Sequence, residues 1–154
     1  MEEKTHITRV NIYIYRKMQE EERIFFEKYS TILHSRSHLA PNGHCRLWDQ
    51  APRGGRKYCE INVRFPGAKK YRKINVARLA LMLKLSVVSL DPALDSSHLC
   101  SNATCINPEH IVLEKHGTNN NRIACFQLGH CTKLHEPHCM INLNIRVCII
   151  YMRM

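Results

Sequence analysis

The sequence lacks any apolar run of membrane-spanning length, and its apolar C-terminal stretch, residues 141–154, is short and interrupted by Arg146 and Arg153. A transmembrane helix needs roughly 20 consecutive apolar residues, so we interpret this stretch as a packing or partner segment. Internal repeats and low-complexity linkers are missing as well. A chain of 154 residues without them fits one compact domain and argues against a repeat architecture.

Acidic residues are scarce: 13 of them face 23 lysines and arginines, which gives a formal net charge of +10. The shortage is most marked in residues 53–78, here called the basic stretch, where Glu60 is the one acid and Tyr58, Phe65 and Tyr71 are interleaved. Such a stretch is typical of a surface that follows a phosphate backbone, although an ordinary solvated face is the alternative. Its cations are Arg53, Arg56, Lys57, Arg64, Lys69, Lys70, Arg72, Lys73 and Arg78.

A secretory signal is also absent from the opening residues Met1, Glu2, Glu3 and Lys4, so the thiols are expected to be reduced. Eight cysteines lie among ten histidines. A disulfide framework is one interpretation of these cysteines. Secreted scaffolds seldom place histidines at regular offsets from their cysteines, so the pattern favours zinc binding over disulfides.

Helices and strands are expected to alternate in the first half of the chain. Residues 17–35 place apolar side chains at helical spacing on one face and acids on the other, which predicts a helix that packs on the core. Residues 45–48 and 58–65 are short strand-like runs separated by turn residues, and they predict a twisted antiparallel sheet. Asn75 is predicted to cap a helix that ends near Leu85.

The block from residue 97 to residue 125 is predicted to form a hairpin followed by a short helix. Asn107 and Pro108 disfavour a helix, and residues 110–113 are apolar and partly β-branched, as in a strand. Thr118 is predicted to be the N-cap of the helix that follows, which places Asn119 in its first turn.

A first metal site is indicated by Cys100, Cys105 and His110, whose Cys-x4-Cys-x4-His spacing turns two thiolates and an imidazole toward one tetrahedral ion. A fourth ligand has to come from upstream, from Cys45 or Cys59. We predict Cys45, because it follows a glycine turn from which a side chain reaches inward, whereas Cys59 alternates within a strand like a small buried apolar residue. The helix ending near Leu85 is expected to back this region.

A second metal site is indicated directly after the first, where six side chains offer more ligands than one ion requires: Cys125, His130, Cys131, His135, His138 and Cys139. The most even set is Cys125, Cys131, His135 and Cys139, with His130 or His138 as alternatives to His135. Four strong ligands leave no open position for water, so both sites are predicted to be structural zinc sites.

A family resemblance is carried by His98, Leu99, Cys100, Asn102, Cys105, Asn107, Pro108, His110, Glu114, Asn119, Arg122 and Cys125. This order resembles the His-Cys box homing endonucleases, members of the ββα-metal or His-Me finger nuclease superfamily. The resemblance covers about residues 97–125, supported by Cys45 and the cysteines up to Cys139. It implies a loop-rich α+β domain with a β-hairpin followed by a helix, two structural zinc ions, and one divalent ion, usually magnesium, at the cleavage site.

The resemblance implies roles for three further side chains. His98 falls on the catalytic histidine, Asn119 on the asparagine that holds magnesium, and Arg64 near the arginine that holds the scissile phosphate, with Arg72 as an alternative. The chemistry agrees, because phosphodiester hydrolysis needs a base for water and a cation for the developing charge. A histidine with a pKa near roughly 6.5 is such a base when a carbonyl or carboxylate orients its other nitrogen, and an amide oxygen suits magnesium.

The predicted function is therefore a metal-dependent DNA endonuclease with double-stranded DNA as its partner. Its DNA contacts are predicted at Arg53, Arg56, Lys57, Arg64, Lys69, Lys70, Arg72 and Lys73. The alternative is a catalytically inactive, zinc-stabilised DNA-binding module. A third interpretation, a protein-interaction zinc domain, leaves the basic stretch unexplained and predicts no salt-sensitive affinity for DNA.

Three segments are expected along the chain. Residues 1–42 form an N-terminal helical segment, residues 43–140 the nuclease domain, and residues 141–154 an apolar tail. Within the domain we expect the basic sheet at about 44–75, the ββα-metal core at about 97–125 and the second zinc loop at 125–139. A homodimer is a hypothesis that rests on the family symmetry and the apolar tail. Reduced thiols and a DNA partner predict an intracellular location, the nucleus in a eukaryote.

Overall fold

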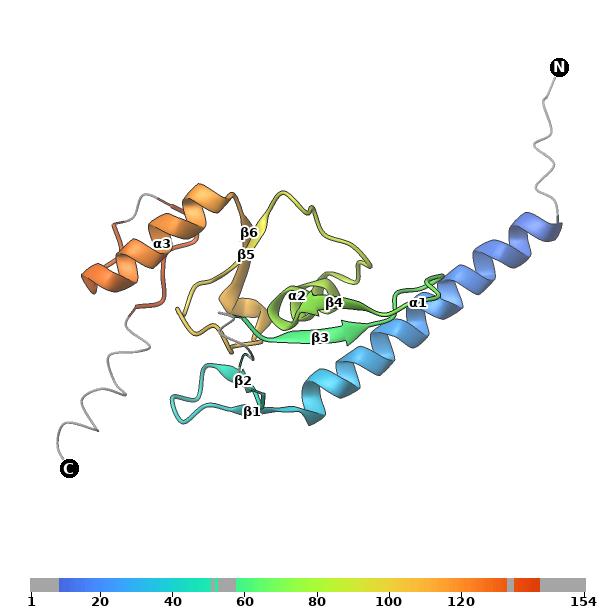
Figure 1. The fold of residues 1–154 in the computed structure, drawn as a ribbon, viewed down its shortest axis with the longest axis horizontal. Coiled ribbons are helices and arrows are strands. Elements are labelled where there is room, and N and C mark those ends of the chain that lie inside the picture. Colours follow the sequence, from blue (N-terminus) through green and yellow to red (C-terminus); the bar gives the residue numbers. More distant parts are fainter. Residues whose placement is uncertain (1–8, 51, 53–57, 133–134, 142–154) are drawn as a thin grey trace, which may run out of the picture.

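The computed structural model describes residues 9–50, 52, 58–132 and 135–141. Figure 1 shows a long helix projecting at one end, a shorter helix at the other, and a third helix with the hairpins between them. None of the described helices combines the length and apolarity needed to cross a lipid bilayer. The elements are α1 (Arg9–Ser35), β1 (Ser37–Leu39), β2 (Arg46–Trp48), β3 (Glu60–Val63), β4 (Arg72–Asn75), α2 (Val76–Leu85), β5 (Asp95–His98), the 3₁₀ helix η1 (Pro108–His110), β6 (Ile111–Glu114) and α3 (His116–Leu128).

The N-terminal helix α1 packs one apolar face on the core, as its periodicity predicts. Phe25, Tyr29 and Leu33 are buried on that face. The Phe25 ring lies 4.9 Å from Tyr29 and 5.5 Å from Phe65, measured between ring centroids. The helix begins at Arg9 rather than near residue 17, so the prediction of its start was wrong. Arg16 and Lys17 stand directly before Met18, the first residue of the predicted apolar period, and they hid the continuation of the helix toward Arg9.

Each strand pairs with one antiparallel partner, so the described strands form three two-stranded hairpins: β1 with β2, β3 with β4, and β5 with β6. The antiparallel pairing confirms the expected fold class. The two predicted runs at 45–48 and 58–65, however, do not pair with each other in the described region; each forms its own hairpin with an unforeseen strand. The described strands therefore form three separate two-stranded sheets in place of the single twisted sheet that was expected.

Helix α2 forms the centre of the core. Its predicted cap is confirmed, because Asn75 Oδ1 accepts hydrogen bonds from the backbone N–H of Ala77 at 2.8 Å and of Arg78 at 3.3 Å. The helix ends at Leu85, and its C-cap is Ser86, whose φ of 53° is left-handed. Its buried residues pack with α1 and β3 in one cluster, and α2 also contacts η1. Because η1 ends with His110, the helix backs the first predicted metal site, as expected.

The hairpin β5–β6 runs directly into α3 and forms a ββα unit (Figure 1). The ladder pairs Asp95 with Glu114 and His98 with Ile111. Helix α3 starts at His116 with Lys115 as its N-cap, and the Lys115 side chain makes no capping bond. The prediction that Thr118 caps this helix was therefore wrong, since the helix starts within two residues of the end of β6 and needs no polar cap to be held there.

Candidate functional site

Four side chains from separate parts of the chain meet in a first tetrad: Cys45, Cys100, Cys105 and His110. All four are buried, and their ligand atoms lie within 4.8 Å of one another. His110 Nδ1 lies 3.6 Å from the Sγ atoms of both Cys45 and Cys105. Ligands at about 2.0–2.3 Å from a tetrahedral zinc lie roughly 3.5–4 Å apart, so the donor set fits that ion in both chemistry and spacing.

The hairpin β1–β2 brings Cys45 to this tetrad. Asn42 Oδ1 accepts from the backbone N–H of Cys45 at 3.1 Å, in a turn where Gly43 has a left-handed φ of 72°. The hairpin is joined to the loop that carries Cys100 and Cys105, here called the cysteine loop, because the backbone N–H of Trp48 donates to Thr104 O at 2.9 Å. Backbone hydrogen bonds thus bring Cys45 close to Cys105, which lies sixty residues further along the chain. The spacing of the cysteines in the sequence does not show this proximity.

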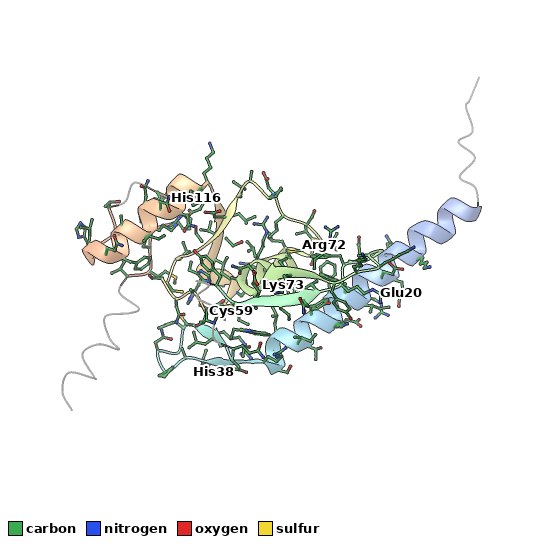
Figure 2. The ribbon with its side chains drawn as sticks, in the orientation of Figure 1. Glu20, His38, Cys59, Arg72, Lys73 and His116 are labelled. Atoms are coloured by element: carbon green, nitrogen blue, oxygen red, sulfur yellow. The ribbon has the colours of Figure 1, made fainter. Side chains whose placement is uncertain are left out.

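The alternative cysteine, Cys59, belongs to a different environment. Its thiol donates to Gln50 O at 3.0 Å, and the residue is buried in the main core cluster with Trp48 and Val63. Figure 2 shows Cys59 beside β3, in the middle of the fold. Burial raises the pKa of this thiol. Cys59 therefore acts as a small apolar core residue, the role expected for it in a strand.

The thiols of the first tetrad have unequal pKa values. A hydrogen bond from Cys100 lowers the pKa of Cys105 to about 5. The same hydrogen bond, together with burial, raises the pKa of Cys100, and burial raises that of Cys45. One thiolate is thus stable by itself and two thiols resist ionisation. A bound dication would offset that resistance, because it favours the charged form of every sulfur around it.

A second tetrad gathers Cys125, Cys131, His135 and Cys139, again with all ligand atoms within 4.8 Å of one another. Its histidine faces the sulfurs: Nε2 lies 3.4 Å from Sγ of Cys125 and 3.6 Å from that of Cys139. Burial opposes ionisation of Cys125, but hydrogen bonds from Thr132 and the contact with His135 lower its pKa to about 6. Burial raises the pKa of Cys139 to about 11.

The two alternative histidines do not enter the second tetrad. His130 is exposed and its Nδ1 lies 3.3 Å from Leu128 O. The side chain of His138 is 47 % exposed and pairs with Glu136. Both rings are therefore engaged outside the group of sulfurs, and His135 is the histidine that the fold brings to them.

A buried ion pair joins the second tetrad to the ββα unit. Arg122 on α3 donates from Nε and Nη2 to the two carboxylate oxygens of Glu114 at 2.7 and 2.8 Å. Its Nη1 also donates to Pro137 O at 2.6 Å and lies 3.0 Å from His135 Nδ1. The Arg122 side chain is 1 % exposed. Both residues belong to the motif that carries the family resemblance, but the sequence assigned them no role. Their contacts join β6, α3 and the loop at residues 135–137, and spacing does not show that these segments meet.

His98 lies at the end of β5, beside the first tetrad. Its Nε2 is 2.9 Å from Cys105 O. A carbonyl only accepts, so Nε2 carries the ring hydrogen and Nδ1 presents a lone pair. Burial lowers the pKa of His98 below its ordinary value, so the ring is neutral at pH 7. The condition set for a general base, a carbonyl on the other nitrogen, is met, and a residue of the first tetrad supplies that carbonyl.

Asn119 is half-buried in the first turn of α3. Its Nδ2 donates to Asp95 Oδ2 at 2.9 Å, and His116 Nδ1 lies 2.7 Å from the same oxygen. Hydrogen bonds from Asn119 and His116 lower the pKa of Asp95. The acid is therefore ionised at neutral pH. Asp95 had no motif to mark it, and its link to Asn119 emerges only when the strand and the helix come together.

The predicted DNA contacts divide into described and undescribed residues. Arg53, Arg56 and Lys57 lie outside the described residues. Arg64 is exposed just after β3 and donates from Nε to Ala68 O at 3.0 Å; among the described contacts none joins it to His98 or Asn119. The other described cations predicted to contact DNA are exposed as well: Lys69, Lys70, Arg72 and Lys73. Figure 2 shows Arg72 and Lys73 on β4.

Arg78 differs from the other cations of the basic stretch. Its guanidinium donates to Leu94 O at 2.8 Å, Leu90 O at 2.9 Å and Asp91 O at 2.5 Å. It thus fixes the loop between α2 and β5 and has little capacity left for a phosphate.

An open groove of about 740 Å³ lies between α1 and the β3–β4 hairpin. Lys28 lines it from α1 and Arg36 from the turn that follows α1, while Tyr58, Tyr71 and Lys73 line it from the hairpin side. Tyr71 is 58 % exposed and Tyr58 38 %. Cations with interleaved aromatic rings suit a nucleic-acid backbone and its bases.

Fold and sites together define a class of protein: a small α+β domain in which a ββα unit is held by two Cys/His tetrads of the structural zinc type. The chain belongs to the family described as the zinc-binding loop region of homing endonuclease, which matches residues 49–150. That match contains all the tetrad residues except Cys45. Searches of curated proteins and of solved structures gave no match.

Proposed function

We propose that this protein is a metal-dependent DNA endonuclease in which His98 is the general base and Asn119 holds one divalent ion, magnesium in the first instance. The observation that carries the proposal is the hydrogen bond between His98 Nε2 and Cys105 O, which gives Nδ1 the lone pair needed to take a proton from water. Membership in a homing endonuclease family supports DNA as the substrate.

The chain's own groups divide the chemistry between them. His98 Nδ1 accepts the proton as water attacks the phosphorus of a phosphodiester. Asn119 Oδ1 is a neutral, hard oxygen ligand, and a magnesium ion held there would stabilise the charge that develops on the phosphate and the leaving oxygen. Arg64 is proposed to hold the scissile phosphate, with Arg72 as the alternative.

Zinc is proposed for both tetrads. Cys45, Cys100, Cys105 and His110 would hold one ion, and Cys125, Cys131, His135 and Cys139 the other. The first ion would crosslink segments that are distant in sequence, and the second would tie α3 to the loop that follows it. Four protein ligands leave each ion without an open position. The first of these ions would also fix the Cys105 carbonyl that orients His98.

Double-stranded DNA is the proposed partner, bound by the exposed cations of the basic stretch and the groove beside α1. Two active centres are needed for a double-strand cut, so a homodimer would make such a cut and a monomer would nick one strand. Apart from Ile141, the apolar tail proposed for the dimer interface lies outside the described residues. The proposed location is intracellular, and nuclear in a eukaryote.

Cleavage of supercoiled plasmid by the zinc-loaded protein, with and without magnesium, tests the proposal. The native protein is expected to nick or linearise the plasmid only with magnesium. His98→Ala is expected to lose at least about 100-fold in rate, the contribution of one general base. Asn119→Ala is expected to lose cleavage because the proposed magnesium ion loses its protein ligand, and both variants are expected to bind DNA still. His38→Ala is the matched control, because His38 is an exposed histidine paired with Asp49 on the β1 hairpin (Figure 2).

Salt-sensitive DNA binding without cleavage under any divalent ion, over a panel of plasmids, would favour the catalytically inactive DNA-binding module. An absence of DNA affinity at low salt would favour a protein-interaction domain and contradict both.

A further inference from the structure

The carboxylate of Asp95 accepts two hydrogen bonds at one oxygen. Asn119 Nδ2 lies 2.9 Å from Oδ2, and His116 Nδ1 lies 2.7 Å from it. Asp95 is the first residue of β5, the strand that ends with His98, whereas the two donors belong to the first turn of α3. This contact therefore joins the strand of the general base to the helix of the proposed magnesium ligand.

The contact settles which way the Asn119 amide points. A carboxylate only accepts hydrogen bonds, so the amide atom that faces it has to be the NH₂ group. The amide oxygen then lies on the other side of the planar group. An unrestrained asparagine turns this group over with little cost, and in the turned state it would present two N–H donors to a cation.

His116 holds the acceptor in place. Its ring nitrogen contacts the oxygen that Asn119 uses, and it lies three residues before Asn119 on the same helix. Figure 2 shows His116 on α3. The Asp95 side chain is 35 % exposed. It is thus confined by two donors rather than by surrounding core atoms, and the orientation of Asn119 depends on these hydrogen bonds.

The geometry points to Asp95 as a positioning residue that acts through Asn119: it takes up the amide NH₂ group and so turns the amide oxygen toward the divalent ion. This inference rests on the proposed function, because it gives Asn119 the ion. Groups that orient a metal ligand typically change metal affinity or activity by about 10- to 100-fold when they are removed.

The test compares Asp95→Ala and Asp95→Asn with Asp49→Ala. Asp49 is the matched control, since its carboxylate accepts from a histidine Nδ1 at 2.6 Å and is 44 % exposed, but among the described contacts none joins it to Asn119. The first readout needs no magnesium: the side-chain amide signal of Asn119 in ¹⁵N-labelled, zinc-loaded protein, identified by its loss in Asn119→Ala. We expect Asp95→Ala to move this signal to the position of an exposed asparagine, and Asp49→Ala to leave it unchanged.

The second readout is the magnesium dependence of plasmid cleavage. Asp95→Ala is expected to raise the half-saturating magnesium concentration about 10-fold or more, with a near-native rate at saturation. Asp95→Asn, which keeps one acceptor oxygen, is expected to lie between Asp95→Ala and the native protein. Asp49→Ala is expected to match the native protein. Native zinc content and melting temperature in each variant show that the fold is retained.

The outcomes separate the inference from the proposed function. If Asn119→Ala is inactive while Asp95→Ala keeps the native amide signal and magnesium dependence, the positioning role is overturned and the endonuclease stands. Loss of cleavage by Asp95→Ala at every magnesium concentration would make the carboxylate more than a positioning group and would also overturn the inference. If the native protein does not cleave, or Asn119→Ala cleaves normally, the proposed function fails, and the positioning role fails with it.

Discussion

Cys45 and Cys59 carry the same side chain in two surroundings that give it opposite roles. The first thiol faces two other thiols and an imidazole, and the second donates to a backbone carbonyl in the apolar core. Sequence reasoning separated them from local context alone, through the glycine turn before Cys45 and the strand alternation around Cys59. It had no means to show the hydrogen bonds that bring the β1–β2 hairpin to the cysteine loop, because those join residues far apart in the chain.

At this scale we predict that Cys45→Ser lowers the zinc content of the purified protein from two ions per chain to one, because a hydroxyl is a poor replacement for a thiolate at zinc. Cys59→Ser is the matched control and is expected to keep both ions, with at most a modest loss of stability from burying a hydroxyl beside Gln50 O. Elemental analysis of the dialysed proteins decides between them. Two zinc ions in Cys45→Ser would remove Cys45 from the proposed ligand set.

At the scale of elements, the ion pair between Arg122 and Glu114 fixes how α3 and the second tetrad sit on the β5–β6 hairpin. Removal of one partner from a buried pair leaves the other charge without compensation, at a typical cost of about 3–5 kcal/mol. We predict that Arg122→Ala lowers the free energy of unfolding by about that amount. Arg23→Ala serves as the control, because Arg23 pairs with Glu20 and Glu27 on the exposed face of α1 and its loss is expected to leave the urea midpoint unchanged.

Equal midpoints for Arg122→Ala and Arg23→Ala would show that the buried pair does not hold these elements together. A second readout is the zinc content of Arg122→Ala. It is expected to fall at the second site, because Arg122 also contacts the backbone and histidine of that loop.

The elements themselves were predictable to different degrees. Helix α2 could be read from its apolar run and its asparagine cap, since both signals are local. The pairing of β1 with β2 and of β3 with β4 could not, because three- and four-residue strands carry almost no periodicity. The early start of α3 was missed for another reason: tertiary contacts from Asp95 to His116 and Asn119 hold a helix end that lacks a side-chain cap.

At the scale of the whole molecule, two kinds of metal ion are proposed with separate duties, and their removal should have separate consequences. The ligands of the two tetrads come from the β1–β2 hairpin, the β5–β6 hairpin, α3 and the loop after α3. Metal ions held there would crosslink much of the described fold. Asn119, by contrast, is proposed as a single ligand at one helix start, where its amide donates to Asp95.

We therefore predict that a strong zinc chelator abolishes the cooperative melting transition, because the binding free energy of structural zinc is part of the folding free energy. Removal of magnesium alone is expected to leave the transition in place and to stop plasmid cleavage. Circular dichroism melting of one protein preparation in both conditions, with cleavage assays in parallel, measures the two effects together. A transition that survives complete zinc removal would mean that the tetrads are held by the core around α2 and not by metal, and the proposed zinc ions would then have no structural role.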